Sequence, residues 1–200
     1  MKFGVIHYNT PGDTIEAFFD YAAGAGFDGV ELAISDVWKE ADPADRPEDT
    51  AWKLREEATQ RGLFIGVLAA GNDFLNASPK AITQQAHRLD RVAGLARILG
   101  ARVLRCDGGW PRDGKEIPPE DRWADVFASG FRQALPYLER HDVVIGLDNH
   151  GTTTNNAVFQ MQVLGMIGSC RVGTTMDTMN YRWMGHDLAT CRPSSSVTVS

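Results

Sequence analysis

Several short apolar stretches of this sequence end on residues that could hold a metal ion or move a proton. The apolar run 143–147 stops at Asp148, Asn149 and His150. Asx residues also end many strands because they tolerate turn conformations, so this stretch alone fits either a turn or a set of ligands. Similar endings recur after other runs, which favours the ligand interpretation: His7 and Asn9, Asn72 and Asp73, Cys106 to Gly109, and Asp177 and Asn180.

A repeating unit of strand and helix would position these residues. Between the apolar runs the hydrophobic period becomes helical; Thr14 and Ser78 precede two such helices, and Gly100 is placed to end the second. Units in this order imply parallel strands with right-handed crossovers, and no GxGxxG motif follows the first run. We therefore predict an α/β fold of the (β/α)8 TIM-barrel type, incomplete with about six βα units. The expected strands are 3–8, 29–34, 64–69, 103–106, 143–147 and 172–176.

Two charged residues lie inside these runs, Glu31 in GVELAI and Arg105 in VLRCDG. Burying either charge alone would be costly, so each is expected to have a partner. Both belong to even-numbered strands, and alternate strands of a barrel supply the same layer of interior side chains. Two interpretations stay open: an internal Glu31–Arg105 ion pair that supports the fold, or a Glu31 that lines a substrate pocket and is kept ionised by Arg105.

The composition indicates a globular enzyme and disfavours several partners. Of 200 residues, 43% are hydrophobic and 23% charged, and the net charge of −6 comes without any Lys/Arg block, which disfavours nucleic acid and anionic membrane surfaces. No apolar stretch has the length of a membrane span, and the start MKFGVIHYNT does not fit a signal peptide. Cys106, Cys170 and Cys191 show no CxxC spacing, which is typical of free thiols in a reducing cytoplasm.

The chain resembles the xylose isomerase-like sugar isomerase/epimerase family, and the match covers roughly residues 1–187. The resemblance implies a (β/α)8 barrel that acts on a carbohydrate or polyol, with carboxylates moving a proton beside a carbonyl. It also implies a divalent metal (Mn, Mg, Co or Zn) that polarises the substrate oxygens. The matching stretches, in order, are MKFGVIHY, AGFDGVEL (25–32), LGARVLRCDGG (99–109), LERHDVVIGLDNHG (138–151) and VGTTMDTMN (172–180).

The resemblance assigns roles to particular residues. Asp148 lies in LDNHG, where the family commonly has LENHG, and takes the position of a metal ligand and catalytic carboxylate; Asp177, in MDTMN, takes that of a second metal ligand. We expect Glu31 to be the other catalytic carboxylate. The residues expected to contact the substrate are His7, Arg105, Asn149, His150 and Asn180.

The sequence also departs from the family pattern. The family's ligands near strand seven and on strand eight have no counterpart, because LATCRPSSSVTVS after Asp187 contains no His, Asp or Glu. We expect residues 1–187 to form a partial barrel and 188–200 a non-homologous or disordered tail. His186 could replace the missing histidine only if its loop folds over the barrel mouth; a surface position is the alternative. Aspartate in place of glutamate draws the carboxylate back by about 1.5 Å, and a misplacement of about 1 Å can cost about 10²-fold in rate.

Three functions stay open. The first is a sugar or sugar-phosphate isomerase/epimerase, inactive or nearly so as this chain alone. The second is a non-catalytic truncated barrel with at most weak metal binding. The third, an endonuclease IV-like DNA repair barrel, would need more His and acidic ligands and a basic face. In each case strands one and six would be open edges that expose interior apolar surface, so we expect a homo-oligomer formed through these edges, or poor solubility.

Overall fold

The fold is seen in a computed structural model that describes residues 1–8 and 10–185. Six strands form one parallel sheet in the order β1-β2-β3-β4-β5-β6, so each strand pairs with the next one along the chain. This confirms the predicted parallel α/β fold with six units. The strands are β1 (Gly4–Ile6), β2 (Gly29–Ala33), β3 (Phe64–Ala69), β4 (Val103–Cys106), β5 (Val144–Asp148) and β6 (Val172–Thr175).

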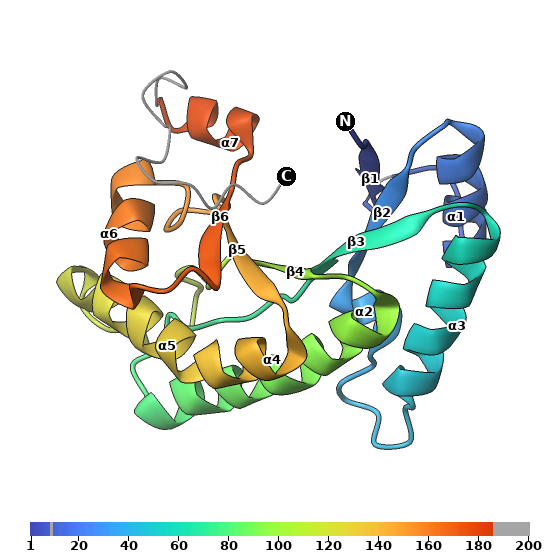
Figure 1. Ribbon diagram of the computed structural model, residues 1–200. Helices are drawn as coiled ribbons and strands as arrows, with labels where there is room; N and C mark the ends of the chain where they lie inside the picture. Colours follow the sequence, from blue (N-terminus) through green and yellow to red (C-terminus); the bar gives the residue numbers. More distant parts are fainter. Residues whose placement is uncertain (9, 186–200) are drawn as a thin grey trace.

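The helices connect successive strands and cover the outer face of the curved sheet. Figure 1 shows α1, α3, α4, α5 and α6 following one another around the outside, as right-handed crossovers require. Within residues 1–8 and 10–185, no helix is both long and apolar enough to cross a membrane. The helical segments are α1 (Ile15–Gly24), α2 (Ile34–Val37), α3 (Pro47–Gln60), α4 (Pro79–Leu99), the 3-10 turn η1 (Glu120–Arg122), α5 (Trp123–His141), α6 (Ala157–Ile167) and α7 (Thr178–Trp183).

Local side chains set the ends of the helices where the sequence predicted them. The Thr14 hydroxyl accepts the Ala17 N–H at the start of α1, and the Ser78 hydroxyl accepts the Ala81 N–H at the start of α4. Gly100 ends α4 in the left-handed conformation, with φ of 86°, which glycine adopts without steric penalty. These caps confirm the predicted boundaries.

The core lies between the helices and the outer face of the sheet. Along each strand, side chains alternate between this core and the inner face. Leu32 of β2 and Leu104 of β4 are buried in the core, whereas Glu31 and Arg105, next to them in the strands, line the inner face. The alternation therefore places the two intra-strand charges on the side away from the helices.

The sheet ends at β1 and β6, which lie on opposite sides of an opening in Figure 1. Several large apolar side chains are exposed near these two strands. Phe3 and Tyr8 flank β1, and Met176, Met179 and Trp183 follow β6; Trp183 is 84% exposed. The six units thus form an open barrel segment with apolar side chains at both edges.

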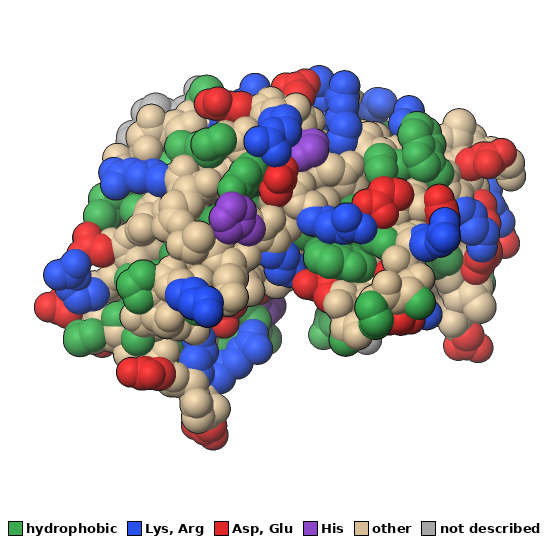
Figure 2. All heavy atoms as spheres, turned by 90° about the horizontal axis from the view of Figure 1, so that it is seen from below, with side chains coloured by type: hydrophobic (Ala, Val, Ile, Leu, Met, Phe, Trp, Pro, Cys, Tyr) green, Lys and Arg blue, Asp and Glu red, His purple; other side chains and the backbone are tan. Residues whose placement is uncertain are grey.

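The outer helices carry charges of both signs. In Figure 2, seen from below, Lys and Arg side chains lie among Asp and Glu rather than in one continuous group. Several of them pair between neighbouring helices, for example Arg91 with Glu48 and Arg140 with Asp90. Such exposed pairs contribute little to stability.

Candidate functional site

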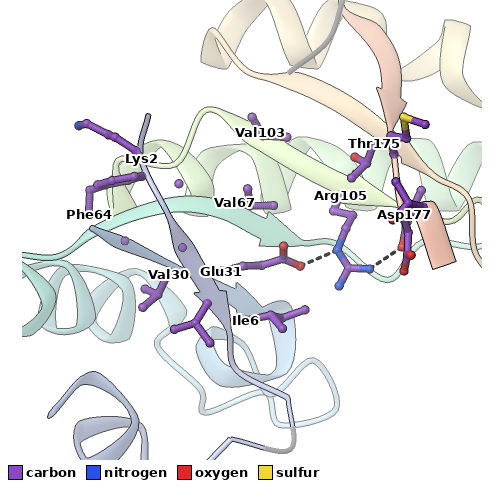
Figure 3. A pocket seen from close by; sticks show the side chains of 17 residues that line it. Lys2, Ile6, Val30, Glu31, Phe64, Val67, Val103, Arg105, Thr175 and Asp177 are labelled. Carbon is purple, nitrogen blue, oxygen red and sulfur yellow. Dashed lines mark hydrogen bonds and ion pairs between the residues drawn. The ribbon is translucent and has the colours of Figure 1, made fainter. Parts of the chain in front are cut away.

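The inner face of the sheet lines a cleft of about 770 Å³ to which all six strands contribute. The cleft extends from Lys2 and Phe64, near the amino ends of the strands, to Asp177 at the carboxyl ends (Figure 3). Asp148, the last residue of β5, also lines it. In barrels of this kind the chemistry lies at the carboxyl ends. The polar end of the cleft is therefore the candidate active site.

A charged triad, Glu31, Arg105 and Asp148, lies at this end. Arg105 Nε donates to Glu31 Oε1 at 2.5 Å, and Arg105 Nη1 donates to Asp148 Oδ2 at 2.6 Å. The three side chains come from β2, β4 and β5, and all three line the cleft. The Glu31–Arg105 ion pair confirms the first interpretation of the intra-strand charges. Glu31 also faces the cleft, but its role in a substrate pocket stays a prediction. The second carboxylate on Arg105, that of Asp148, was not expected from the sequence.

Sharing one guanidinium between two carboxylates shapes the electrostatics of the triad. Burial raises the pKa of Glu31, outweighing the attraction of Arg105, and the negative charge of Asp148 adds to the increase. Burial on its own would lower the pKa of Arg105, but Glu31 and Asp148 raise it overall. Arg105 is therefore a permanent cation, and Glu31 holds a proton more readily than an exposed glutamate does.

Asp177 follows β6 and caps the amino end of α7. Its Oδ1 accepts the N–H groups of Met179 and Asn180 at 2.9 and 3.2 Å. Asn149 fixes it relative to β5, because the fully buried Asn149 side chain accepts the Asp177 N–H and donates to the Asp177 carbonyl, both at 2.7 Å. Asp148 and Asp177 are thus held at the ends of adjacent parallel strands and line the same cleft, as their sequence positions predicted.

Four other residues expected at the site are not among the described residues that line the cleft. His7 contacts Asp36, with its Nδ1 atom 3.1 Å from Asp36 Oδ1. His150 is exposed, and its ring centroid is 5.8 Å from that of Trp110. Asn149 joins the strand ends, and Asn180 lies in the first turn of α7. Asn9, His186 and Cys191 lie outside the described residues.

The loops after β3, β4 and β5 are locked together by contacts that the sequence did not reveal. Lys115 Nζ lies 2.6 Å from Asp73 Oδ2, and Thr153 Oγ1 donates to the Gly109 carbonyl at 2.6 Å. Gly109 has φ of 99°, and a Cβ there would lie 2.0 Å from Asp73 Oδ1. The Gly108-Gly109 pair was the only sequence signal of this close approach. The contacts tie these three loops to one another.

Asn72, which follows β3, is also part of this end of the sheet. It is 2% exposed, and neither its side-chain oxygen nor its nitrogen has a hydrogen-bond partner among the described residues. Burying an amide without partners is unfavourable. The sequence placed Asn72 at a strand end but gave no indication of this burial.

The two strand-end carboxylates fit part of a divalent cation site, because oxygen ligands suit hard cations. Asp148 and Asp177 each use one oxygen in the contacts above, which leaves one oxygen on each carboxylate. Within residues 1–8 and 10–185, no three His, Cys, Asp or Glu side chains converge in a way that could hold a metal ion. The described residues therefore form no complete metal site, and the role of Asp148 and Asp177 as ligands stays a prediction.

Comparison with solved structures shows what the fold is similar to. A xylose isomerase domain protein from Alicyclobacillus acidocaldarius subsp. acidocaldarius matches with a TM-score of 0.70 and 19% identity, over 92% of this chain and 66% of that one. D-psicose 3-epimerase with D-tagatose from Clostridium cellulolyticum H10 matches with a TM-score of 0.73 and 15% identity, over 91% of this chain and 65% of that one. The IOLI protein with a binding zinc atom matches with a TM-score of 0.75 and 16% identity, over 94% of this chain and 66% of that one.

These matches extend along nearly all of this chain but not along the other proteins. The chain spans about two thirds of the length of these three structures. No curated protein matches the sequence. The sequence model of one family, described as a xylose isomerase-like TIM barrel, matches residues 19–196. The chain therefore belongs to the xylose isomerase-like TIM barrel family.

Proposed function

We propose that this chain forms the six-unit part of a sugar or sugar-phosphate isomerase/epimerase that moves a proton beside the carbonyl of a carbohydrate or polyol. The observation that carries the proposal is the placement of Asp148 and Asp177 at adjacent strand ends, in one cleft with Glu31 and Arg105. The similarity to D-psicose 3-epimerase supports this substrate class at the level of the fold.

In this proposal the residues of the cleft divide the tasks among them, and Asp148 has two. Asp148 and Asp177 hold a divalent cation (Mn, Mg, Co or Zn), which polarises the substrate oxygens when it is bound. Asp148 and Glu31 are the proton-transfer carboxylates, and the raised pKa of Glu31 makes it hold a proton more readily than an exposed glutamate does. Arg105 neutralises both, and Asn149 acts as a positioning residue for Asp177.

His7, His150 and Asn180 remain proposed substrate contacts that would need a substrate reaching beyond the described cleft. His150, exposed at the end of β5, is the best placed of the three. His186 is proposed only as a replacement for the missing histidine ligand, and it lies outside the described residues.

The reaction needs proton-transfer groups on both faces of the substrate. Asp148 and Glu31 contact the same guanidinium, so we expect the group for the opposite face to lie outside the described residues. The longer proteins of the family have a further third of chain in which such a group can lie. We therefore expect this chain by itself to have little or no turnover. A non-catalytic barrel segment with weak metal affinity is the second candidate, favoured by the ion pair that already engages Asp148. No contact of the described residues favours the endonuclease alternative.

Association through the open edges belongs to the same proposal. The apolar side chains beside β1 and β6 would be covered in a homo-oligomer, which would remove their surface from water and stabilise the assembly. A cytoplasmic location suits Cys106 and Cys170, which are free cysteines.

The proposed metal site is tested by titrating the chain with Mn²⁺ and following free Mn²⁺ by electron paramagnetic resonance. We expect one saturable site that is lost in Asp148→Asn and in Asp177→Asn. Asp142→Asn is the matched control, because Asp142 pairs with Arg102 and Arg171 outside the cleft. Equal binding curves for all four proteins would disprove the proposed site.

A further inference from the structure

The cleft already contains a cation in contact with a proposed metal ligand. Arg105 Nη1 lies 2.6 Å from Asp148 Oδ2, so the guanidinium occupies one oxygen of the carboxylate that the proposed function gives to a metal ion. The Asp148 side chain is 6% exposed and that of Arg105 25% exposed. At this degree of burial, charges interact more strongly than they do in water.

A divalent cation at Asp148 would carry the same sign of charge as Arg105. A guanidinium that stays in contact with the carboxylate would repel the ion and would leave it a single oxygen at this residue. Binding of the ion is therefore coupled to release of Asp148 by Arg105.

Glu31 can receive the released guanidinium. Arg105 Nε already donates to Glu31 Oε1 at 2.5 Å, and a guanidinium has five N–H donors in a fork that suits two oxygens of one carboxylate. The Glu31 and Asp148 carboxylates contact Arg105 from β2 and β5, and Figure 3 shows Arg105 pointing toward Glu31.

The strand register explains why Arg105 can reach both carboxylates. Arg105 pairs in register with Gly146, which places Asp148 two residues further on the same face of the sheet. Gly146 adds no side chain between them, and a Cβ at that position would lie 2.2 Å from Thr175 Oγ1. The Thr175 hydroxyl therefore occupies the space beside Gly146, and a larger residue at position 146 would displace it.

We propose that Arg105 is an internal counter-ion that competes with a divalent cation for Asp148, and that Glu31 sets the outcome by holding Arg105 away. This inference rests on the proposed function, because it needs Asp148 to be a metal ligand. Glu31 then strengthens metal binding without contacting the ion, and Arg105 weakens it. Both act as positioning residues toward the metal.

Two variants that shift Mn²⁺ affinity in opposite directions test the competition. Glu31→Gln leaves Arg105 with Asp148 as its only anionic partner among residues 1–8 and 10–185, so Mn²⁺ should bind at least about tenfold more weakly. Glu31→Gln combined with Arg105→Gln frees Asp148 while keeping amide side chains in both places, and Mn²⁺ should bind at least about tenfold more tightly than to the wild type. Structural damage would weaken binding in both variants.

The double variant also separates the competition from bulk electrostatics. It removes one negative and one positive charge, so the net charge of the chain is unchanged and long-range attraction predicts equal affinity. The control is Glu48→Gln with Arg91→Gln, an exposed ion pair on the outer helices with the same change of charge. We expect this control to bind Mn²⁺ as the wild type does.

A second measurement needs no variant. In a titration of the wild type with Mg²⁺, followed by NMR, the Nε–Hε signal of Arg105 should shift with the same midpoint as metal binding. Equal Mn²⁺ affinity of the wild type and the double variant, or an Arg105 signal that does not respond to bound Mg²⁺, overturns the inference while leaving the metal site intact. Absence of binding in every protein overturns the metal site and the inference together.

Discussion

Replacing Arg105 by methionine would leave two carboxylates in the cleft without their shared cation. The substitution removes hydrogen bonds of 2.5 Å to Glu31 and 2.6 Å to Asp148. Removing one partner of a buried ion pair costs about 3–5 kcal/mol. Because the Arg105 side chain is 25% exposed, solvent moderates the loss, and we expect the free energy of unfolding at pH 7 to fall by about 2–4 kcal/mol.

The loss should shrink at low pH. Burial raises the pKa of Glu31 in the native chain, and removal of the guanidinium should raise it further. A carboxylate whose pKa is higher in the folded chain than in the unfolded chain binds more protons when folded. The fold therefore loses stability as the pH rises from the pKa of glutamate in the unfolded chain, about 4.3, through its pKa in the folded chain. Urea denaturation at pH 4.5 and pH 7 should therefore give a smaller deficit at pH 4.5.

The matched control for this measurement is Arg171→Met. The Arg171 side chain is 29% exposed, close to that of Arg105, but its partner Asp142 is half exposed. We expect a much smaller deficit at pH 7 for this control. If the two variants lose equal stability at pH 7, or if the Arg105→Met deficit is the same at both values of pH, the reasoning about the buried triad is wrong.

Three further predictions concern stability and association. Asn149→Leu should lower the free energy of unfolding by about 2–4 kcal/mol, because the Asp177 N–H and carbonyl lose their partners; an unchanged urea midpoint would contradict this. Asn72→Leu should be neutral or stabilising by about 1 kcal/mol, because it removes a buried amide without partners among the described residues; a clear loss of stability would reveal a partner. The chain should associate with rising concentration in light scattering, and Trp183→Glu should weaken association whereas Trp52→Glu, changed at an exposed site on α3, should not.

The sequence predicted the strands and several helix ends because these depend on local patterns. The runs 64–69 and 103–106 coincide with β3 and β4, and Thr14, Ser78 and Gly100 cap helices as their types suggest. The other strand limits differ by one or two residues, since hydrogen bonding fades gradually at strand ends. Helix α3 begins at Pro47, and its amphipathic pattern was not singled out.

The sequence predicted the candidate site less completely because partners depend on register between strands. Glu31 and Arg105 were expected to pair, but the contact of Arg105 with Asp148 follows from the pairing of Arg105 with Gly146, which no local pattern reveals. Asn149 was expected to contact the substrate. Its side chain joins two strand ends. An Asx residue at a strand end suits either task, so the contact with a substrate stays a prediction.

The central claim is that Asp148 and Asp177 together hold a divalent cation at the carboxyl end of this cleft. Crystals of the chain soaked in Mn²⁺ test it most directly, through the anomalous difference density measured near the manganese absorption edge. We predict one strong peak in contact with both carboxylates, with Arg105 turned toward Glu31. A strong peak elsewhere, or none near Asp148 and Asp177 when the cleft is open to solvent in the crystal, would contradict the claim.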